Sequence, residues 1–465
     1  MFLKSITTVA LLFVTCSLSA SSFAEEPNKA LPKGPTALTA VDRAMDGTIS
    51  LHFDKRPLDE VVLELDRRLS VKVELNDEPI ADFGVPANAP VTVDVKEISL
   101  ASALTIMLGS LDLGWCERNG KLVITTEGDS EEDTEVRYYD VTALIHGKGR
   151  NASFTDLMVQ IVSCVRPQSW PDGTGPLPIE PYEIGEMRLF AIPQSSLGHR
   201  EVRLFLDSLR QAKHDDVEGN NYVFQPPKQI EHPNYAVCRA LDRQVRLDIP
   251  DLPKEARECV RPFGEVVKLL AKAADVNIVI DRRALGEDDM KSRTPIRIAP
   301  MQGTLRECLN RVCRASAELK HLEKDDAMFP KQPNRLCWTI ANEVVWITTR
   351  DEEESMVSAR IFDVWDMPPE PTKWVPEKAG GWVVDPRLPH EREKLTLAIS
   401  KTIAPGAWED FSASLARYEG SRTIAMIVFA RHGVHEQVES FLAALREARR
   451  KGAAEAKSPN RTASR

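Results

Sequence analysis

The stretch from Pro90 to Leu111 constrains the fold most, because its pattern returns 205 positions later, from Pro295 to Ser316. Both stretches predict a short strand followed by an amphipathic helix with a polar N-cap, Ser99 in the first and Thr304 in the second. Only three positions are identical between them, so the agreement lies in the hydrophobic pattern and the cap. We therefore expect two copies of one fold in this chain.

The residues around each stretch extend the repeat into a larger unit, which we call A. Alternating apolar residues predict a strand from Thr48, a helix follows Pro57, and an Asn119-Gly120 turn precedes a closing strand. The expected order is strand, helix, strand, then strand and helix, then a hairpin. We place A1 at 48–128 and A2 at 241–350.

A second type of unit, called B, follows each A unit, with the expected order strand, helix, strand, strand, helix. Both copies have a Pro-x-x-Trp-x-Asp turn after the first helix, from Pro167 and from Pro405. We place B1 at 134–212 and B2 at 357–450. The predicted fold class is thus α+β, a tandem repeat of two small α/β-sandwich modules in the order A1–B1–linker–A2–B2.

The remaining segments are predicted from their composition. Residues 1–24 are typical of a secretory signal peptide, with Lys4, an apolar core and the small residues Ser22 and Ala24 before the cleavage point. A membrane anchor is the alternative, but the apolar run is short for a bilayer span. The other predictions are a flexible leader at 25–47, a linker at 213–240 and a disordered basic tail at 451–465.

Charge and cysteine content limit the compartment and the partners. The formal charge of −10 disfavours nucleic-acid binding, and the basic loop from Gly147 to Arg150 matches neither a P-loop nor a Gly-x-x-Gly clamp. Cleavage of the signal removes Cys16 and leaves seven of the eight cysteines, so a complete disulfide framework is impossible. A bond between Cys238 and Cys259 stays open. We expect an exported, periplasmic or envelope-associated protein with no membrane span after cleavage.

No residues are predicted to be catalytic, cofactor-binding or metal-binding. Three groups could suggest such chemistry, but we prefer a structural explanation for each. Cys308 and Cys313 are expected to pack in a core, and the acidic runs Asp129–Asp133 and Asp351–Glu354 to be solvated connectors. The paired histidines His199 and His435 are expected to pack at the start of a helix.

Three tryptophans form the candidate partner or ligand surface. Trp365, Trp374 and Trp382 lie in a Pro-rich loop of B2 that has no counterpart in B1. Such a loop either packs on its own module or presents an aromatic patch to a protein or a glycan.

On these residues the A units resemble the secretin and TonB N-terminal short domain, through Pro57-Leu58, Leu100 with Leu104, and the closing strand Leu122 to Thr126. The B units resemble the ring-building, KH-like domains of secretin periplasmic regions, over Val136 to Leu209 and Arg360 to Leu445. No long run of alternating strands follows B2, so we do not expect a complete pore function.

The resemblance implies a non-enzymatic interaction or assembly module of the cell envelope, acting on a protein partner or on itself. The alternative is a module that binds or senses an envelope ligand, a glycan or a small molecule. An enzyme is disfavoured, because no nucleophile–base pair or metal constellation is visible in the sequence.

Overall fold

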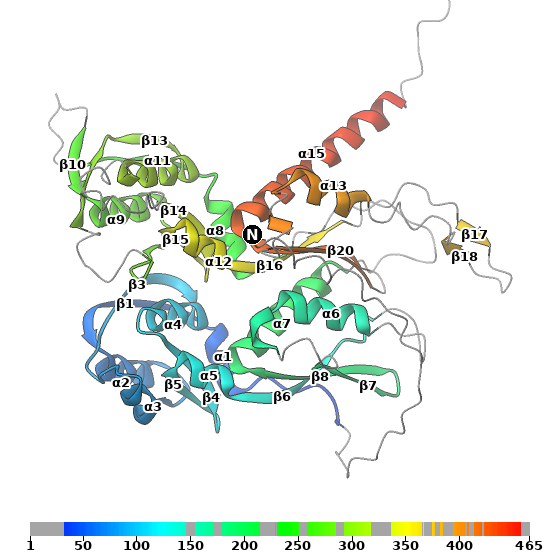
Figure 1. Ribbon diagram of the computed structural model, residues 1–465, viewed down its shortest axis with the longest axis horizontal. Helices are drawn as coiled ribbons and strands as arrows, with labels where there is room; N and C mark the ends of the chain where they lie inside the picture. Colours follow the sequence, from blue (N-terminus) through cyan, green and yellow to red (C-terminus); the bar gives the residue numbers. More distant parts are fainter. Residues whose placement is uncertain are drawn as a thin grey trace, which may run out of the picture. The chain divides into compact units, whose positions relative to one another are not determined.

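The computed structural model describes residues 32–145, 154–170, 178–213, 228, 230–250, 258–284, 293–317, 336–364, 366, 374–376, 382–384, 394–404, 407–408, 413–420 and 423–456. The predicted signal peptide at 1–24 lies outside them. Met1–Gly34 and Pro35–Arg465 are separate units, and all helices and strands below belong to the second. The fold is mixed α+β, as predicted, with small sheets of two or three strands packed against helices (Figure 1).

The A1 segment has a two-stranded ribbon and a three-stranded sheet. The ribbon pairs β1 (Thr48–Pro57) with β3 (Pro90–Ser99), and the sheet has the order β2 (Val73–Leu75), β5 (Lys121–Thr126), β4 (Leu113–Arg118). The helices are α2 (Leu58–Arg68), α3 (Asp77–Asp82) and α4 (Leu100–Gly109). Only α3 was not predicted.

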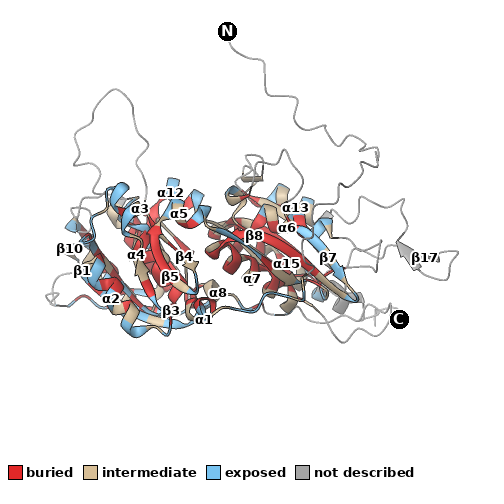
Figure 2. Ribbon diagram, turned by 90° about the horizontal axis from the view of Figure 1, so that it is seen from below, coloured by how far each residue is buried: buried red, intermediate tan, exposed pale blue. Residues whose placement is uncertain are grey.

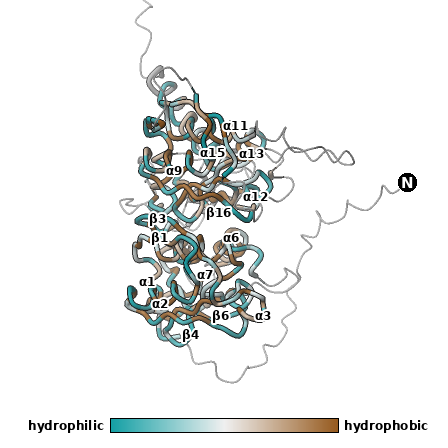
Figure 3. The backbone as a smooth tube through the Cα atoms, turned by 90° about the vertical axis from the view of Figure 1, so that its left-hand side faces the viewer, coloured by the Kyte–Doolittle hydropathy of each residue, from teal (hydrophilic) through white to brown (hydrophobic). Residues whose placement is uncertain are grey.

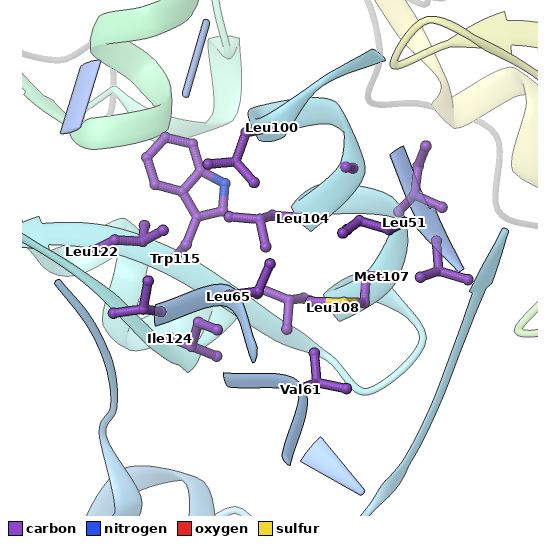
Figure 4. Packing of buried hydrophobic residues seen from close by; sticks show 14 of the residues in the cluster. Leu51, Val61, Leu65, Leu100, Leu104, Met107, Leu108, Trp115, Leu122 and Ile124 are labelled. Atoms are coloured by element: carbon purple, nitrogen blue, oxygen red, sulfur yellow. The ribbon is translucent and has the colours of Figure 1, made fainter. Parts of the chain in front are cut away.

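The apolar faces of α2 and α4 meet over the A1 sheet. Figure 4 shows Leu65 of α2 and Leu104 of α4 among the side chains of Trp115 and Ile124, and all four are buried. The predicted cap is confirmed, since Ser99 Oγ accepts a hydrogen bond from the Ser102 backbone N–H at 3.2 Å. The sequence pattern from Pro90 to Leu111 therefore forms one side of this core.

The B1 segment follows the predicted order. Its sheet has the order β6 (Thr134–Asp140), β8 (Met187–Ser195), β7 (Glu180–Ile184), and its helices are α6 (Thr155–Cys164) and α7 (Ser196–Gln211). At the predicted corner, the Trp170 indole N–H donates to the Val165 carbonyl at 2.7 Å, and Trp408 donates to Ile403 in the B2 segment.

The A2 segment has short strands connected by two long helices. These elements are β9 (Gln244–Leu247), β10 (Cys259–Pro262), α9 (Phe263–Ala274), β11 (Ile278–Ile280), β12 (Pro295–Ile298), β13 (Met301–Thr304), α11 (Leu305–Ala317), β14 (Leu336–Ala341) and β15 (Val344–Thr349). Strands β11, β15 and β14 form a sheet in that order, and the predicted cap Thr304 accepts from the Glu307 backbone N–H at 3.2 Å.

Among its described residues, the B2 segment has a three-stranded sheet, the helices α13 and α15, and a pair of short strands that B1 lacks. The elements are β16 (Val357–Asp363), β17 (Trp374–Pro376), β18 (Trp382–Val384), α13 (Lys394–Thr402), β19 (Ser414–Gly420), β20 (Thr423–Arg431) and α15 (His432–Ala456). The sheet order is β16, β20, β19.

Most buried apolar residues of the described chain fall into four clusters, each built mainly from one of the segments A1, B1, A2 and B2. Figure 2 shows the burial concentrated in central strands such as β5 and β8, whereas β7 is largely exposed. Hydropathy follows the same division, with hydrophobic stretches inside the packed layers (Figure 3). No described helix has the length and apolar character needed to cross a membrane.

Three segments predicted to lack structure are partly helical. The leader at 25–47 contains α1 (Ala40–Asp46), the linker at 213–240 contains α8 (Pro233–Ala240), and α15 continues into the tail as far as Ala456. Val41 and Met45 of α1 are buried in the A1 core, and Val237 of α8 is buried in the A2 core. The leader and the linker were predicted wrongly because tertiary burial stabilises helices as short as α1 and α8, which are hard to recognise from sequence. In the tail, the prediction is wrong only in where the helix ends.

Candidate interaction surfaces

The three tryptophans of the predicted surface are only partly placed. Trp365 lies outside the described residues. Trp374 and Trp382 lie on β17 and β18, where Trp374 is opposite Val384 and Trp382 is opposite Pro376. The structure therefore brings two of the three residues into one small hairpin.

The acidic runs are not simple solvated connectors. They form the short helices α5 (Glu127–Glu132) and α12 (Arg350–Ser355), each capped by a threonine. Asp129 pairs with Arg118 at 3.0 Å, and the buried Glu353 pairs with Arg431 at 2.8 Å. These carboxylates therefore hold the helices onto neighbouring strands.

His199 and His435 are buried structural residues. His199 Nε2 lies 2.9 Å from the Glu135 carbonyl oxygen, and His435 Nε2 lies 3.1 Å from that of Val428, so each Nε2–H donates. Burial lowers the pKa of His199 to about 4 and that of His435 to about 3. Both rings are neutral at neutral pH and serve packing at the helix start, as the sequence indicated.

The cysteines show no paired or metal-binding arrangement in the described part of the chain. All seven described cysteines are free, including Cys238 and Cys259, whose pairing the sequence left open. Cys308 and Cys313 are buried in the A2 core, as predicted. Over the same residues, no group of three His, Cys, Asp or Glu side chains is arranged to hold a metal ion.

A cleft of about 520 Å³ lies between α11, β14, α12 and the start of α15. Its carboxylate Glu436 has two partners: Arg306 donates to it at 2.6 Å, and His432 Nε2 lies 3.0 Å from it. Burial raises the pKa of Glu436, but contacts with His432 and Arg306 outweigh it and hold the pKa below its usual value. We see no poised acid, base or nucleophile in this arrangement.

The sheet of the B2 segment is apolar on both faces, which is its most informative feature. Consecutive residues alternate between two cores: Phe362 and Val428 pack with α13 and α15, whereas Ile361 and Ile427 belong to the B1 core. Figure 1 shows α6 and α7 between the B1 sheet and strands β16 and β20. B1 helices therefore cover the second face of the B2 sheet.

The B1 sheet has a corresponding face that the described chain leaves without a helix layer. In β8, Phe190 and Ile192 point to the B1 core, and the alternate residues Leu189 and Ala191 lie on the opposite face, where both are nevertheless buried. Tyr138 and Tyr182 are the partners of Ala191 and Leu189 in the neighbouring strands, and their rings contact each other at a centroid distance of 6.2 Å. Val136, in the same strand as Tyr138, is 46% exposed.

Helix α15 of B2 differs from helix α7 of B1 in having an exposed side. None of the 16 residues of α7 is exposed, because that helix lies between two sheets. In α15, by contrast, several residues between Gln437 and Ala444 are exposed, and Leu397 of α13 is 49% exposed. The outer side of the B2 helices is thus exposed, whereas the corresponding side of the B1 helices is covered by the B2 sheet.

The A segments make a similar contact. Val344 of the A2 sheet is buried in the A1 core, with Val279 and Trp346 packed against it. Two polar side chains of A2 fix this contact: Asn277 exchanges two hydrogen bonds with the Lys96 backbone, at 2.8 and 2.9 Å, and Glu343 binds the start of α4. The equivalent face of A1 is charged, with Lys121 bonded to Glu74 at 2.8 Å.

Comparison with protein-family models, curated proteins and solved structures found no match to this chain. The interaction surfaces above were missed by sequence reasoning, although a signal for them exists. Uninterrupted apolar runs such as Ile424 to Ala430 indicate a strand buried on both faces.

Proposed function

We propose that this chain is a non-enzymatic protein–protein interaction and assembly module of the cell envelope, exported through the signal peptide at 1–24 and similar to the periplasmic region of secretins. The proposal includes the tandem order A1–B1–linker–A2–B2. It also includes self-association through the B modules.

One observation carries the proposal: the B2 sheet is covered by B1 helices, while no helix of the described chain covers the matching face of the B1 sheet. The centre of that face is buried at Leu189 and Ala191, but Val136 at its edge is 46% exposed. The B2 helices likewise have an exposed outer side, which includes Leu397. In this contact the helices of one module pack on the sheet of another, so the two surfaces that meet are different. The first module keeps a free sheet face and the second keeps a free helix side, and these two free surfaces can form the same contact between chains. Val136, Tyr138 and Tyr182 provide an apolar and aromatic surface of the kind found in interfaces. The charged A1 face, in contrast, does not favour repetition of the A contact.

Light scattering after size exclusion, with the full chain over a range of concentrations, tests this function. We expect the mass to rise with concentration, and Val136→Glu to weaken association at least about tenfold, because it places an unpaired carboxylate in the contact. The matched control is Val260→Glu, at a residue of β10 that is 61% exposed. A strict monomer at every concentration, or equal weakening by both variants, would contradict self-association.

A second candidate function is binding of a glycan or small molecule of the envelope by Trp365, Trp374 and Trp382. The register of β17 and β18 favours it, because Trp374 and Trp382 belong to one two-stranded ribbon. Tryptophan rings in general offer flat apolar faces to sugar rings.

The double variant Trp374→Ala/Trp382→Ala is expected to lose binding of a soluble peptidoglycan fragment, measured by titration calorimetry, while the mass of the protein stays unchanged. Val375→Ala, on the same strand, is the control and should bind as the wild type does. Equal binding by the double variant and the control would exclude this surface.

A further inference from the structure

Helix α8 (Pro233–Ala240) connects segments that are far apart in the sequence. The side-chain oxygen of Asn234 accepts a hydrogen bond from the backbone N–H of Glu343, in the A2 hairpin, at 2.8 Å. Tyr235 packs against Arg360 of β16, whose guanidinium carbon lies 4.6 Å from the ring centroid. Val237 is buried in the A2 core. The helix therefore joins the B2 sheet to the A2 module.

The N-terminus of α8 is capped by an imidazole. His232 is the N-cap residue, and its Nδ1 accepts a hydrogen bond from the Asn234 backbone N–H at 3.3 Å. The usual caps are Ser, Thr, Asp and Asn, whose oxygens remain acceptors in mild acid. A neutral imidazole has one acceptor nitrogen, whereas the protonated ring has none. This cap therefore exists only while His232 is neutral.

The surroundings of His232 oppose a positive charge on its ring. The ring lies against Tyr235, with centroids 5.1 Å apart. The charged groups that face it are Arg200 of α7 and Arg360 of β16, and His435 of α15 is a nearby neutral ring. Nε and Nη1 of Arg360 have no hydrogen-bond partner among the described residues, so its charge is only partly compensated.

The carboxylates around this junction already have partners, so they do not compensate a new charge on His232. They are Glu439 with Arg360 at 2.7 Å, Glu436 with Arg306 at 2.6 Å, Glu343 with the Ser102 hydroxyl at 2.8 Å, and Glu231 with Arg239 at 3.7 Å.

We propose that His232 is a proton-operated latch, which holds α8 between the B2 sheet and the A2 hairpin while neutral and releases it when protonated. Protonation removes the cap acceptor of α8. It also places a third positive charge beside Arg200 and Arg360. Both effects weaken the docked position of the helix.

The direction of the pH dependence follows from linkage. Burial, followed by Arg200 and Arg360, lowers the pKa of His232 to about 4, below its ordinary value of 6.5. The undocked histidine therefore binds a proton more readily than the docked one. Docking is at full strength above about pH 6.5 and weakens as the pH falls toward about 4.

Hydrogen–deuterium exchange of the α8 amides in the full chain tests the latch. Between about pH 7.5 and about pH 5, after correction for intrinsic exchange, the opening equilibrium should rise about 30-fold in the wild type. His232→Asn supplies an amide oxygen that caps the helix at both pH values, so its rise should stay below about threefold. The matched control is His52→Asn, because the His52 side chain is 78% exposed; it should behave as the wild type does.

Equal rises in the wild type and His232→Asn would overturn the proposal. If the variant exchanges rapidly at both pH values, an NMR titration of the wild-type His232 ring decides instead. A midpoint near the ordinary value of histidine would then overturn the latch, and a midpoint well below it would support the latch.

Discussion

Replacing Arg137 with methionine is expected to lower the free energy of unfolding by about 3–5 kcal/mol, the usual cost of removing one partner of a buried ion pair. The Arg137 side chain is 7% exposed and donates to both oxygens of Asp42 at 2.9 Å. It also lies 3.4 Å from Glu117 and 2.5 Å from Glu135. It therefore joins α1 and the A1 hairpin to the first strand of B1.

The loss is large because the buried Asp42 and the largely buried Glu117, whose side chain is 11% exposed, would remain without a cation. Burial raises the pKa of Asp42, but hydrogen bonds from Thr39 and Arg137 outweigh it and hold the pKa below its usual value. Burial raises the pKa of Glu117 despite contacts with Thr39 and Arg137. Without Arg137 burial would raise the pKa of both carboxyls, so the variant would take up protons on them at a higher pH than the wild type does. The difference in stability between wild type and variant should therefore begin to shrink above the ordinary carboxyl pKa and continue to shrink as the pH falls.

Urea unfolding at neutral and acidic pH measures this effect. The control is Arg246→Met, since Arg246 forms an exposed pair with Asp248 and should change stability by less than about 1 kcal/mol. The double variant Arg137→Met/Asp42→Asn should recover part of the loss. A similar small effect of Arg137→Met and Arg246→Met would show that the buried network contributes little.

Replacing Glu343 with alanine is expected to lower the free energy of unfolding by about 2–4 kcal/mol. Its carboxylate accepts hydrogen bonds from the Ser99 backbone N–H at 3.2 Å, the Ser102 hydroxyl at 2.8 Å and the Ser99 hydroxyl. These donors lie at the N-terminus of α4, where unpaired N–H groups and the helix dipole favour a negative charge. The A2 hairpin thus provides an anionic cap for a helix of A1.

Exchange of the first-turn amides of α4 and urea unfolding should both report this change. Glu343→Gln keeps an acceptor oxygen and is expected to lose less stability than Glu343→Ala. The control is Glu354→Ala, because Glu354 is exposed and lies 3.6 Å from Arg350, a pair worth less than about 1 kcal/mol. If Glu343→Ala leaves the α4 amides as protected as in the wild type, the cap is unimportant.

Local signals predicted the elements well where they were strong. The caps Ser99 and Thr304, the apolar face containing Leu104, and the corner at Trp170 all have the predicted roles. Each depends on residues at most a few positions apart, so the sequence carries the information directly. The order of strands and helices in the B1 segment follows for the same reason.

The wrong predictions concern elements whose structure depends on contacts between residues that are far apart in the sequence. Helix α1 has only seven residues, and although Thr39 and Asp42 form a capping box, Val41 and Met45 need the A1 core to stabilise the helix. Helix α8 begins at Pro233 and is capped by His232, and histidine is not among the residues usually recognised as caps. The predicted tryptophan surface is only partly placed. The strands that carry Trp374 and Trp382 are paired, but Trp365 lies outside the described residues.

The sequence by itself determined the α+β class, the periodicity of each helix and strand and the caps that begin the main helices, because these depend on neighbouring residues. The tertiary structure decided which apolar faces meet. Ile361 and Phe362 are adjacent and both apolar, yet one packs against B1 and the other against α13 and α15. The hydrophobic effect is non-directional, so an apolar residue in the sequence does not specify which residue it packs against. Its packing partner is specified only by the folded arrangement of sheets and helices.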